Sequence, residues 1–389
     1  TKTVTYDGVI TGSTAFTKSG DGTLDLGGTN TYTGATNIDD GELNVTGTLS
    51  DSTAVTVASG ATYDSDTTDT IGSIAGAGSI EINTATTLTV GGDDSSTTFS
   101  GVISEDGNLT KAGSGTLTLS GTNTNTGTTT ISAGTLTLDQ ASNTTGTVIA
   151  NTAAVTVNGG ILNLADTTET IGALTLTSGS ITGTSKTLTG SSYTLNPGAD
   201  VSVSVAPILA GSVNLTKSAA GTAILSAANT YSGTTTISDG TLEVDGTLAQ
   251  TAVTVSSGAT YDVDATDTVL SIAGAGTIDL TDAALTAGDG NDLEFSGVFN
   301  GANTFTKVGS ATLTLSGDNS SASYTGRVII DAGTISISSD SNLGSPNILD
   351  ADRLTLQGGT LQTTADFTLN TNRGITLSTD GGIINTNTG

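Results

Sequence analysis

One lysine position recurs through the sequence and holds most of its lysines. It accounts for four of the six lysines, namely Lys18, Lys111, Lys217 and Lys307. A ladder of ammonium groups along a rod could bind sugars or a protein partner. We favour a second interpretation, in which each lysine is a turn residue that offsets local acidity by meeting Asp40 or Asp239 in a neighbouring turn. Surface ion pairs of that kind are common and weak.

A tyrosine position recurs in the same segment. It holds Tyr32, Tyr231 and Tyr324, while the second copy has Asn125 in its place. Aromatic rings spaced along a rod could bind glycans. The asparagine indicates that the ring is dispensable, so we favour a tyrosine that packs against the neighbouring turn.

Acidic residues recur as the motif D-x-T-[DE]-T. Its copies are Asp66–Thr70, Asp166–Thr170 and Asp264–Thr268, and Asp64 and Asp262 precede two of them. Such carboxylates could collect oxygen ligands for Ca²⁺. Asp and Thr also form turns that hydrogen-bond to themselves, which is the interpretation we favour. The segment GDGNDL from Gly288 is similar to the calcium-binding RTX nonapeptide, but it occurs once, with Glu294 at an apolar position, and we treat it as coincidence.

Catalysis is the rival interpretation, because clustered Asp or Glu can cleave polysaccharides. Glycoside hydrolysis requires two carboxylates at a defined separation in a cleft, whereas these acids recur with the repeat. Lyase chemistry would need a basic residue near the sugar, and only Arg327, Arg353 and Arg373 are available besides the lysines. We therefore predict that the chain is not an enzyme and has no catalytic, cofactor-binding or metal-binding residues, with Ca²⁺ as the one cofactor left open.

The elements that would position these residues follow from four copies of one segment. The copies are KSGDGTLDLGGTNTYTGATNIDDGEL from Lys18, KAGSGTLTLSGTNTNTGTTTISAGTL from Lys111, KSAAGTAILSAANTYSGTTTISDGTL from Lys217 and KVGSATLTLSGDNSSASYTGRVIIDAGTI from Lys307. Leu24 to Leu43 and Leu117 to Leu136 span 19 residues each, and the fourth copy inserts SAS before Tyr324. Apolar residues alternate with Thr, and Gly, Asn, Asp or Ser punctuates each run, which predicts strands and turns throughout.

A strand-turn pattern with a 19-residue period predicts a chain that winds, each coil lying on the last as a parallel strand. We predict an all-β, single-chain, right-handed parallel β-helix of roughly 20 coils, since parallel crossovers are right-handed by default. A longer period is also present: GTLSDSTAVTV from Gly47 returns as GTLAQTAVTV from Gly246. Residues 1–389 are thus expected to form one continuous solenoid with modules at 1–97, 98–205, 206–293 and 294–389.

Amino-acid composition excludes several classes of partner and a membrane-spanning helix. The 389 residues lack Trp, Met, His and Cys, and the formal net charge is -28. Phosphate contacts require clustered Lys and Arg, so nucleic acid and anionic membrane surfaces are not expected partners. No window is apolar enough for a transmembrane helix. Because residue 1 is Thr, we expect a processed product or an excerpt.

The phrase LTKxGxGTLTLSGxNTYTGxTTxxxGTL resembles the passenger-associated transport repeat of bacterial autotransporters. The stretch SNLGSPN and the rungs from Leu354 to Asn385 are similar to the same family. The resemblance implies a right-handed β-helical passenger exported through an outer-membrane barrel to the bacterial cell surface. It also implies a structural or adhesive rod: an adhesin stalk or an extracellular matrix or biofilm filament.

The expected partners are host or cell-surface glycans and proteins, or other copies of the chain. The ends GGIINTNTG and TKTVTYDGVITG are in phase with each other, which predicts a longer array or protomers stacked end to end. Two alternatives stay open: a polysaccharide-degrading β-helix enzyme, and an inert scaffold for a functional domain outside this segment.

Overall fold

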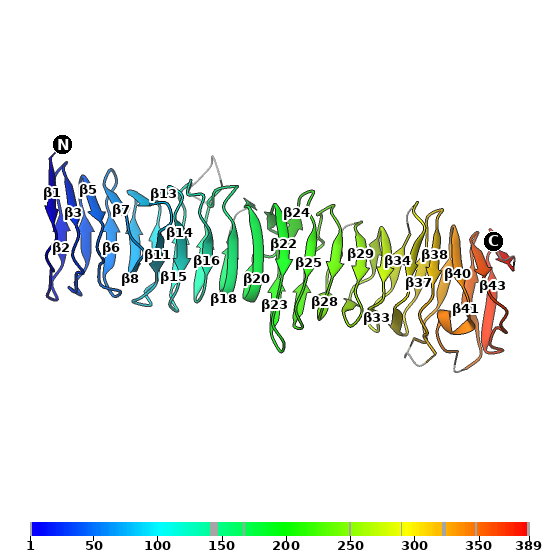
Figure 1. Ribbon diagram of the computed structural model, residues 1–389. Coiled ribbons are helices and arrows are strands. Elements are labelled where there is room, and N and C mark those ends of the chain that lie inside the picture. Colours follow the sequence, from blue (N-terminus) through cyan, green and yellow to red (C-terminus); the bar gives the residue numbers. More distant parts are fainter. Residues whose placement is uncertain are drawn as a thin grey trace. The chain divides into compact units, whose positions relative to one another are not determined.

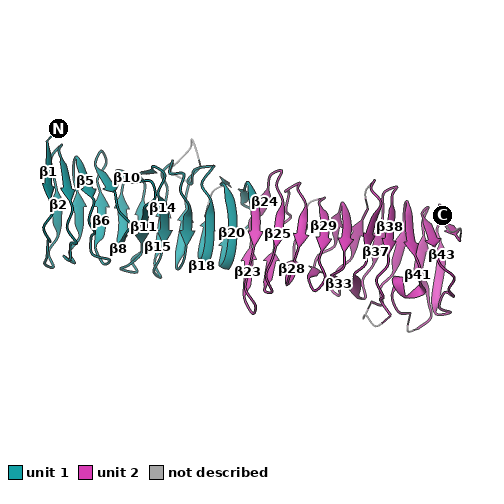
Figure 2. Ribbon diagram, viewed as in Figure 1, with its two compact units in different colours: residues 1–192 teal, residues 193–389 magenta. Residues whose placement is uncertain are grey.

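The computed structural model describes residues 2–140, 147–165, 168–248, 250–288, 290–320, 324–346 and 348–386. Contacts divide the chain into two compact units, Thr1–Ser192 and Tyr193–Gly389 (Figure 2). The division into four sequence modules within one continuous solenoid stays a prediction.

The strands arise from alternation of Thr with aliphatic residues. In the segments Thr116–Leu119 (β15) and Thr135–Leu138 (β17), each Thr is partly exposed and each Leu is buried. Successive side chains of a strand point to opposite faces, so the Leu side chains enter the core while Thr lines the outside. Leu117 pairs with Leu136, and Leu119 with Leu138, so identical residues stack from coil to coil.

Unit 1 contains three parallel ladders, whose strands follow one another in Figure 1. The first joins β1 (Thr3–Tyr6), β3 (Thr23–Leu26), β5 (Glu42–Val45), β7 (Thr62–Ser65), β10 (Ser79–Ile82) and β13 (Val102–Ser104). The second joins β2 (Phe16–Lys18), β4 (Thr36–Ile38), β6 (Ala54–Val57), β9 (Ser73–Gly76), β12 (Thr97–Phe99), β15, β17 and β18 (Val155–Leu164). The third joins β8 (Asp69–Ile71), β11 (Thr87–Val90), β14 (Asn108–Lys111), β16 (Thr129–Ile131), β18 and β20 (Ala173–Thr182), while β19 (Glu169–Thr170) pairs with β21 (Thr187–Thr189).

Unit 2 repeats this plan. One ladder joins β22 (Ser192–Leu195), β25 (Leu215–Lys217), β27 (Thr235–Ile237), β29 (Ala252–Val255), β32 (Ser271–Gly274), β35 (Leu293–Phe295), β38 (Thr312–Leu315), β40 (Thr334–Ile337), β42 (Thr360–Thr363) and β44 (Ile383–Asn385). A second joins β23 (Ser202–Val205), β26 (Thr222–Leu225), β28 (Thr241–Val244), β30 (Thr260–Val263), β33 (Thr277–Leu280) and β36 (Val298–Gly301). The third joins β31 (Asp267–Val269), β34 (Leu285–Ala287), β37 (Phe305–Lys307), β39 (Val328–Ile330), β41 (Asp350–Leu356) and β43 (Arg373–Leu377). The strand β24 (Ile208–Ala210) is not part of these three ladders.

The sequence spacing of the repeats equals the observed register. Leu24 pairs with Leu43, and Leu313 pairs with Ile335, so the 19-residue and 22-residue intervals are each one coil. The inserted residues 321–323 themselves lie outside the described residues. Gly41 and Gly240 have φ of 65° and 64° at the corner between strands, where left-handed backbone favours glycine.

The fold prediction is confirmed as an all-β solenoid of parallel strands, with about 18 turns against the roughly 20 expected. The difference has a physical cause, because some coils exceed the 19-residue period: Ile335 pairs with Leu361, 26 residues later. The one helix among the described residues is a short 3₁₀ turn, η1 (Asp340–Leu343), capped by Ser339. It is far too short to cross a bilayer, and the described residues contain no helix that could.

Candidate functional site

The four repeat lysines lie inside the coils. None is more than 6% exposed. In unit 2 the Nζ of Lys217 donates to the carbonyl oxygens of Ser218 (3.3 Å), Ala219 (2.7 Å) and Asp239 (2.8 Å). The first two belong to its own turn and the third to the turn of the next coil, so the ammonium group joins two successive coils.

The other three lysines make the same kind of contact. Lys18 donates to Gly20 O (2.7 Å) and Asp40 O (2.9 Å). Lys111 donates to Ala112 O, Gly113 O (3.0 Å) and Ala133 O (3.4 Å). Lys307 donates to Val308 O (2.6 Å), Gly309 O (3.1 Å) and Ala332 O (3.5 Å). The predicted meeting with Asp40 and Asp239 therefore occurs, but through their carbonyl oxygens. The expectation of a surface ion pair was wrong, because the lysine is buried and its contacts are backbone carbonyls.

Burial also changes the pKa of two of these lysines, Lys111 and Lys217. Loss of solvation lowers the pKa of Lys217 to about 8, against the opposing effect of the nearby Asp239 carboxylate. Burial likewise lowers the pKa of Lys111, with Asp94 acting in the opposite direction. A ladder of such lysines does not present ammonium groups to a ligand in solvent.

An asparagine that the sequence analysis did not single out is a second internal contact. Asn229 is 4% exposed, its Oδ1 accepts from the backbone N–H of Leu209 at 3.0 Å, and its Nδ2 donates to Ala227 O at 3.0 Å and Thr247 O at 3.1 Å. Leu209 lies 20 residues earlier and Thr247 18 residues later, so one side chain ties together three successive coils.

The same geometry recurs in the other repeats, at Asn30, Asn123 and Asn319. Their Oδ1 atoms accept from Ile10 N (3.0 Å), Ile103 N (2.7 Å) and Phe299 N (2.7 Å). A signal was present in the sequence, since each of the four repeated segments has Asn at this place. The signal was overlooked because asparagine is also a common residue of exposed turns.

The repeat tyrosines are buried rather than aligned on the surface. Tyr32, Tyr231 and Tyr324 are at most 1% exposed, and the hydroxyl of Tyr231 lies 2.7 Å from Thr235 Oγ1. Packing against the neighbouring turn is confirmed, and a glycan platform made of these rings is ruled out by their burial. Asn125 is also buried, and its Nδ2 has no hydrogen-bond partner in the structure.

The second acid of the D-x-T-[DE]-T motif is turned inward. Asp69 Oδ2 accepts from Leu49 N at 2.9 Å, and Asp267 Oδ2 accepts from Leu248 N and from the Tyr261 hydroxyl, each at 2.9 Å. In the middle copy Glu169 accepts from the N–H groups of Val148 and Ile149, while Asp166 and Thr167 lie outside the described residues. These carboxylates satisfy backbone donors of the preceding coil, as a turn residue would.

The calcium arrangement considered for this motif is not formed in its described copies, because Asp66 and Asp264 lie toward solvent while Asp69 and Asp267 are buried. Among the described residues, three acidic groups do converge, namely Glu243, Asp245 and the motif residue Asp264, whose carboxylate oxygens lie within 4.8 Å of one another. Burial and neighbouring carboxylates raise the pKa of Glu243 and of Asp264.

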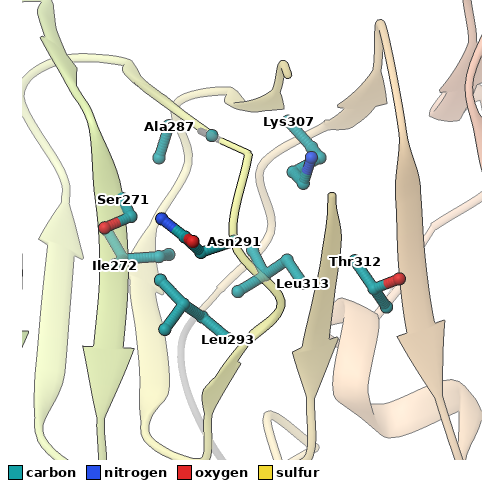
Figure 3. Close-up of a pocket in the computed structure, with 9 residues that line it drawn as sticks. Ser271, Ile272, Ala287, Asn291, Leu293, Lys307, Thr312 and Leu313 are labelled. Atoms are coloured by element: carbon teal, nitrogen blue, oxygen red, sulfur yellow. The ribbon is translucent and has the colours of Figure 1, made fainter. Parts of the chain in front are cut away.

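The GDGNDL segment lies at the surface over its described part, where Asn291 and Asp292 are exposed, and Asp289 lies outside the described residues. Asn291 and Leu293 line a half-open cavity of about 10 Å³ with Ile272, Leu313 and Lys307 (Figure 3). A cavity of this size holds at most one water molecule.

The arginines serve internal contacts near the end of unit 2. Arg373 Nε lies 2.7 Å from Asp340 Oδ1, and its Nη2 donates to Gly344 O at 2.7 Å. Arg353 is 7% exposed and lies 3.7 Å from Asp350, while the more exposed Arg327 lies 3.4 Å from Asp352. The guanidinium groups of Arg353 and Arg373 therefore stabilise η1 and the last coils.

Carboxylates that are half-buried or buried make the stability of the fold depend on pH. Burial, together with the carboxylate of Asp66, raises the pKa of Asp64 to about 7, and burial with Asp264 raises the pKa of Asp262 to about 7. Burial raises the pKa of Asp69 to about 6, against the hydrogen bonds from Leu49 and Thr70. The folded chain therefore binds these protons more tightly than the unfolded chain does.

We expect the melting temperature to be higher at about pH 5 than at about pH 8. The stabilisation from a raised carboxyl pKa is fully present below the unfolded value near 4 and is lost as pH rises through about 6 to 7. Circular dichroism melts at fixed ionic strength would measure it, and Asp64→Asn with Asp262→Asn should flatten the profile. A melting temperature that is constant or rises from pH 5 to pH 8 would contradict the expectation.

Comparison with known proteins identifies the repeated segment. A family model described as passenger-associated-transport-repeat matches residues 16–45, 109–138, 215–244 and 305–337. Each match contains one buried lysine and one coil-joining asparagine. No solved structure matches the chain.

A curated relative extends over nearly all of the sequence. The chain is 34% identical over 431 aligned residues to the adhesin BmaC autotransporter of Brucella suis biovar 1 (strain 1330), covering 97% of this chain and 12% of that protein. The chain thus spans about an eighth of the relative's length. With four transport repeats, this similarity and a parallel β-solenoid fold, the chain belongs to the autotransporter passenger domains.

Proposed function

We propose that this chain is a surface-exposed, adhesive section of an autotransporter passenger, exported across the outer membrane, which acts by binding and not by catalysis. The observation that carries the proposal is the inward direction of the recurring lysines, tyrosines and asparagines. These side chains hold coils together, which leaves the lateral faces, rich in Thr, Ser and Asp, as the surface available to partners. The relative named as an adhesin supports the same role.

Adhesion would arise from many equivalent weak contacts along the coils. Repetition of a weak site raises the overall avidity without any new contact, because later contacts form within one complex. The charge of -28 selects against polyanionic partners and favours neutral or basic ones.

Beads coated with the folded chain test this proposal on cultured epithelial cells. We expect saturable binding that soluble chain competes away, whereas beads coated with heat-unfolded chain should not bind. Binding of coated beads no greater than that of albumin-coated beads would contradict an adhesive role. Hydrolysis of a polysaccharide by the same preparation would favour the enzymatic alternative instead.

Exposed apolar side chains favour a second candidate, self-association of copies into a filament. Val102 on β13, the last strand of its ladder, is 39% exposed, and Ile348 and Leu349 are 69% and 72% exposed. Large exposed apolar residues on strand edges favour pairing with another chain. Sedimentation velocity at micromolar concentration should show species above 38 kDa, and a single monomeric species would contradict filament formation by this segment.

A further inference from the structure

A polar trough that is open to solvent lies on the lateral face of unit 1. Its volume is about 600 Å³, within the range of ligand sites in proteins. It is lined by three loops from successive coils, residues 29–31, 48–52 and 68–70, with Gly92 from a fourth. We call this surface the hydroxyl trough.

The chemistry of the hydroxyl trough is uniform. Seven of its residues carry a side-chain hydroxyl, namely Thr29, Thr31, Thr48, Ser50, Ser52, Thr68 and Thr70. The others with polar side chains are Asn30, Asp51 and Asp69, and no Lys or Arg lines it. Hydroxyls both donate and accept hydrogen bonds, as the hydroxyls of a sugar do.

The trough has a rigid floor. Asp69 Oδ2 accepts from Leu49 N at 2.9 Å, and Asn30 Nδ2 donates to Thr48 O at 3.1 Å. The loop above it closes through a hydrogen bond from Thr53 N to Ser50 O at 2.9 Å. A site already fixed in one conformation loses little conformational entropy when a ligand binds.

Unit 2 contains the same floor contacts, and the sequence between them is one residue shorter. Asp267 accepts from Leu248 N and Asn229 donates to Thr247 O, which repeats the contacts of Asp69 and Asn30. Between Leu49 and Thr53 the chain has Ser50-Asp51-Ser52, whereas between Leu248 and Thr251 it has only Ala-Gln. The wall of the hydroxyl trough is therefore a local addition to a repeated scaffold.

We propose that the hydroxyl trough binds a neutral glycan chain, an inference that rests on the adhesive function proposed above and names its ligand class and site. Sugar hydroxyls replace water on the Thr and Ser rows, with Asp51 accepting hydrogen bonds at the rim. The two carboxylates and the lack of basic lining residues disfavour sialylated or sulfated glycans by like-charge repulsion.

A printed array of neutral, sialylated and sulfated oligosaccharides tests the proposal with the full chain. The key variant replaces Ser50-Asp51-Ser52 with Ala-Gln, the sequence that the chain itself uses at 249–250, so the variant is expected to fold. We expect wild-type chain to bind neutral oligosaccharides and this variant to lose about tenfold or more in affinity, since several hydrogen bonds are removed.

Asp21→Asn is the matched control, because Asp21 is an exposed carboxylate of the same unit that does not line the trough. Neutral glycan binding by this variant should change by less than about threefold, since surface substitutions away from a site have small effects. The proposal is overturned if binding is confined to sialylated or sulfated glycans, if no neutral glycan binds, or if the shortened loop binds equally.

The bead assay on cells separates failure of the site from failure of the function. If wild-type beads adhere and shortened-loop beads adhere equally, the trough is not the site, although adhesion stands. If wild-type beads do not adhere, the adhesive function itself fails.

Discussion

Asn229→Asp is expected to lower the free energy of unfolding by about 3–5 kcal/mol, the largest effect of any substitution considered in the repeats. Aspartate has the same shape and keeps an oxygen facing Leu209 N. It replaces the Nδ2 donor with a second oxygen that faces Ala227 O and Thr247 O. The side chain would then lose its contacts with its own coil and with the next one, and it would place a buried negative charge against two carbonyl acceptors.

Chemical denaturation followed by circular dichroism would measure this loss. Asn196→Asp is the matched control, because Asn196 is exposed on the surface of the same unit. The control should change stability by less than about 0.5 kcal/mol, the usual range for surface substitutions. Equal effects of the two substitutions would mean that Asn229 does not tie the coils together.

Lys217→Met is expected to lower the free energy of unfolding by about 2–4 kcal/mol. Methionine fills a similar volume without a charge, so burial of the side chain is retained. The carbonyl oxygens of Ser218, Ala219 and Asp239 lose the donor that they share. Removal of the cost of burying the ammonium group offsets part of this loss, which is why the expected effect is smaller than that of Asn229→Asp.

The same denaturation experiment with Lys2→Met provides the comparison, since Lys2 is exposed. Lys2→Met should leave stability within about 0.5 kcal/mol of the wild type. If Lys217→Met were neutral or stabilising, the lysine would contribute no net stability and the junction of the two coils would depend on the asparagine and the apolar stack.

The coiling of the chain could be predicted from the sequence because one repeat period, the 19-residue interval, recurs along it. Leu43, Tyr63 and Ile80 occupy successive coils of one ladder, and each is buried on the same side of its strand. Where the interval grows, as between Ile335 and Leu361, the pattern of Thr and apolar residues still fixes the register. Coil number was less predictable, because loop length varies without changing the strands.

The alternation of residues along the strands indicates that the repeat lysines point inward. Their charge indicates an exposed position, and the charge was given more weight. In Phe305-Thr306-Lys307 the alternation that buries Phe305 also points Lys307 inward. Charged residues are seldom buried without partners, and the partners here are backbone carbonyls that leave no trace in the sequence. The inward carboxylates Asp69 and Asp267 were hidden for the same reason, since they accept from backbone N–H groups.

The hydroxyl trough could not be predicted from the repeated pattern at all. It depends on one extra residue between Leu49 and Thr53 relative to the equivalent loop of unit 2, and on how the loops of successive coils lie against each other. Comparison of repeats shows what is common to the scaffold, whereas a binding surface arises where one copy differs from the others.

Amine footprinting of the native chain is the most direct test of the central claim, which is that the recurring polar side chains join coils and do not face a ligand. Native protein would be labelled with an acetylating reagent, digested and compared with protein labelled in denaturant. We predict that Lys2 reacts readily while Lys18, Lys111, Lys217 and Lys307 stay unmodified until the chain unfolds. Modification of these four lysines in the native chain at the rate of Lys2 would contradict the claim and restore an exposed lysine ladder.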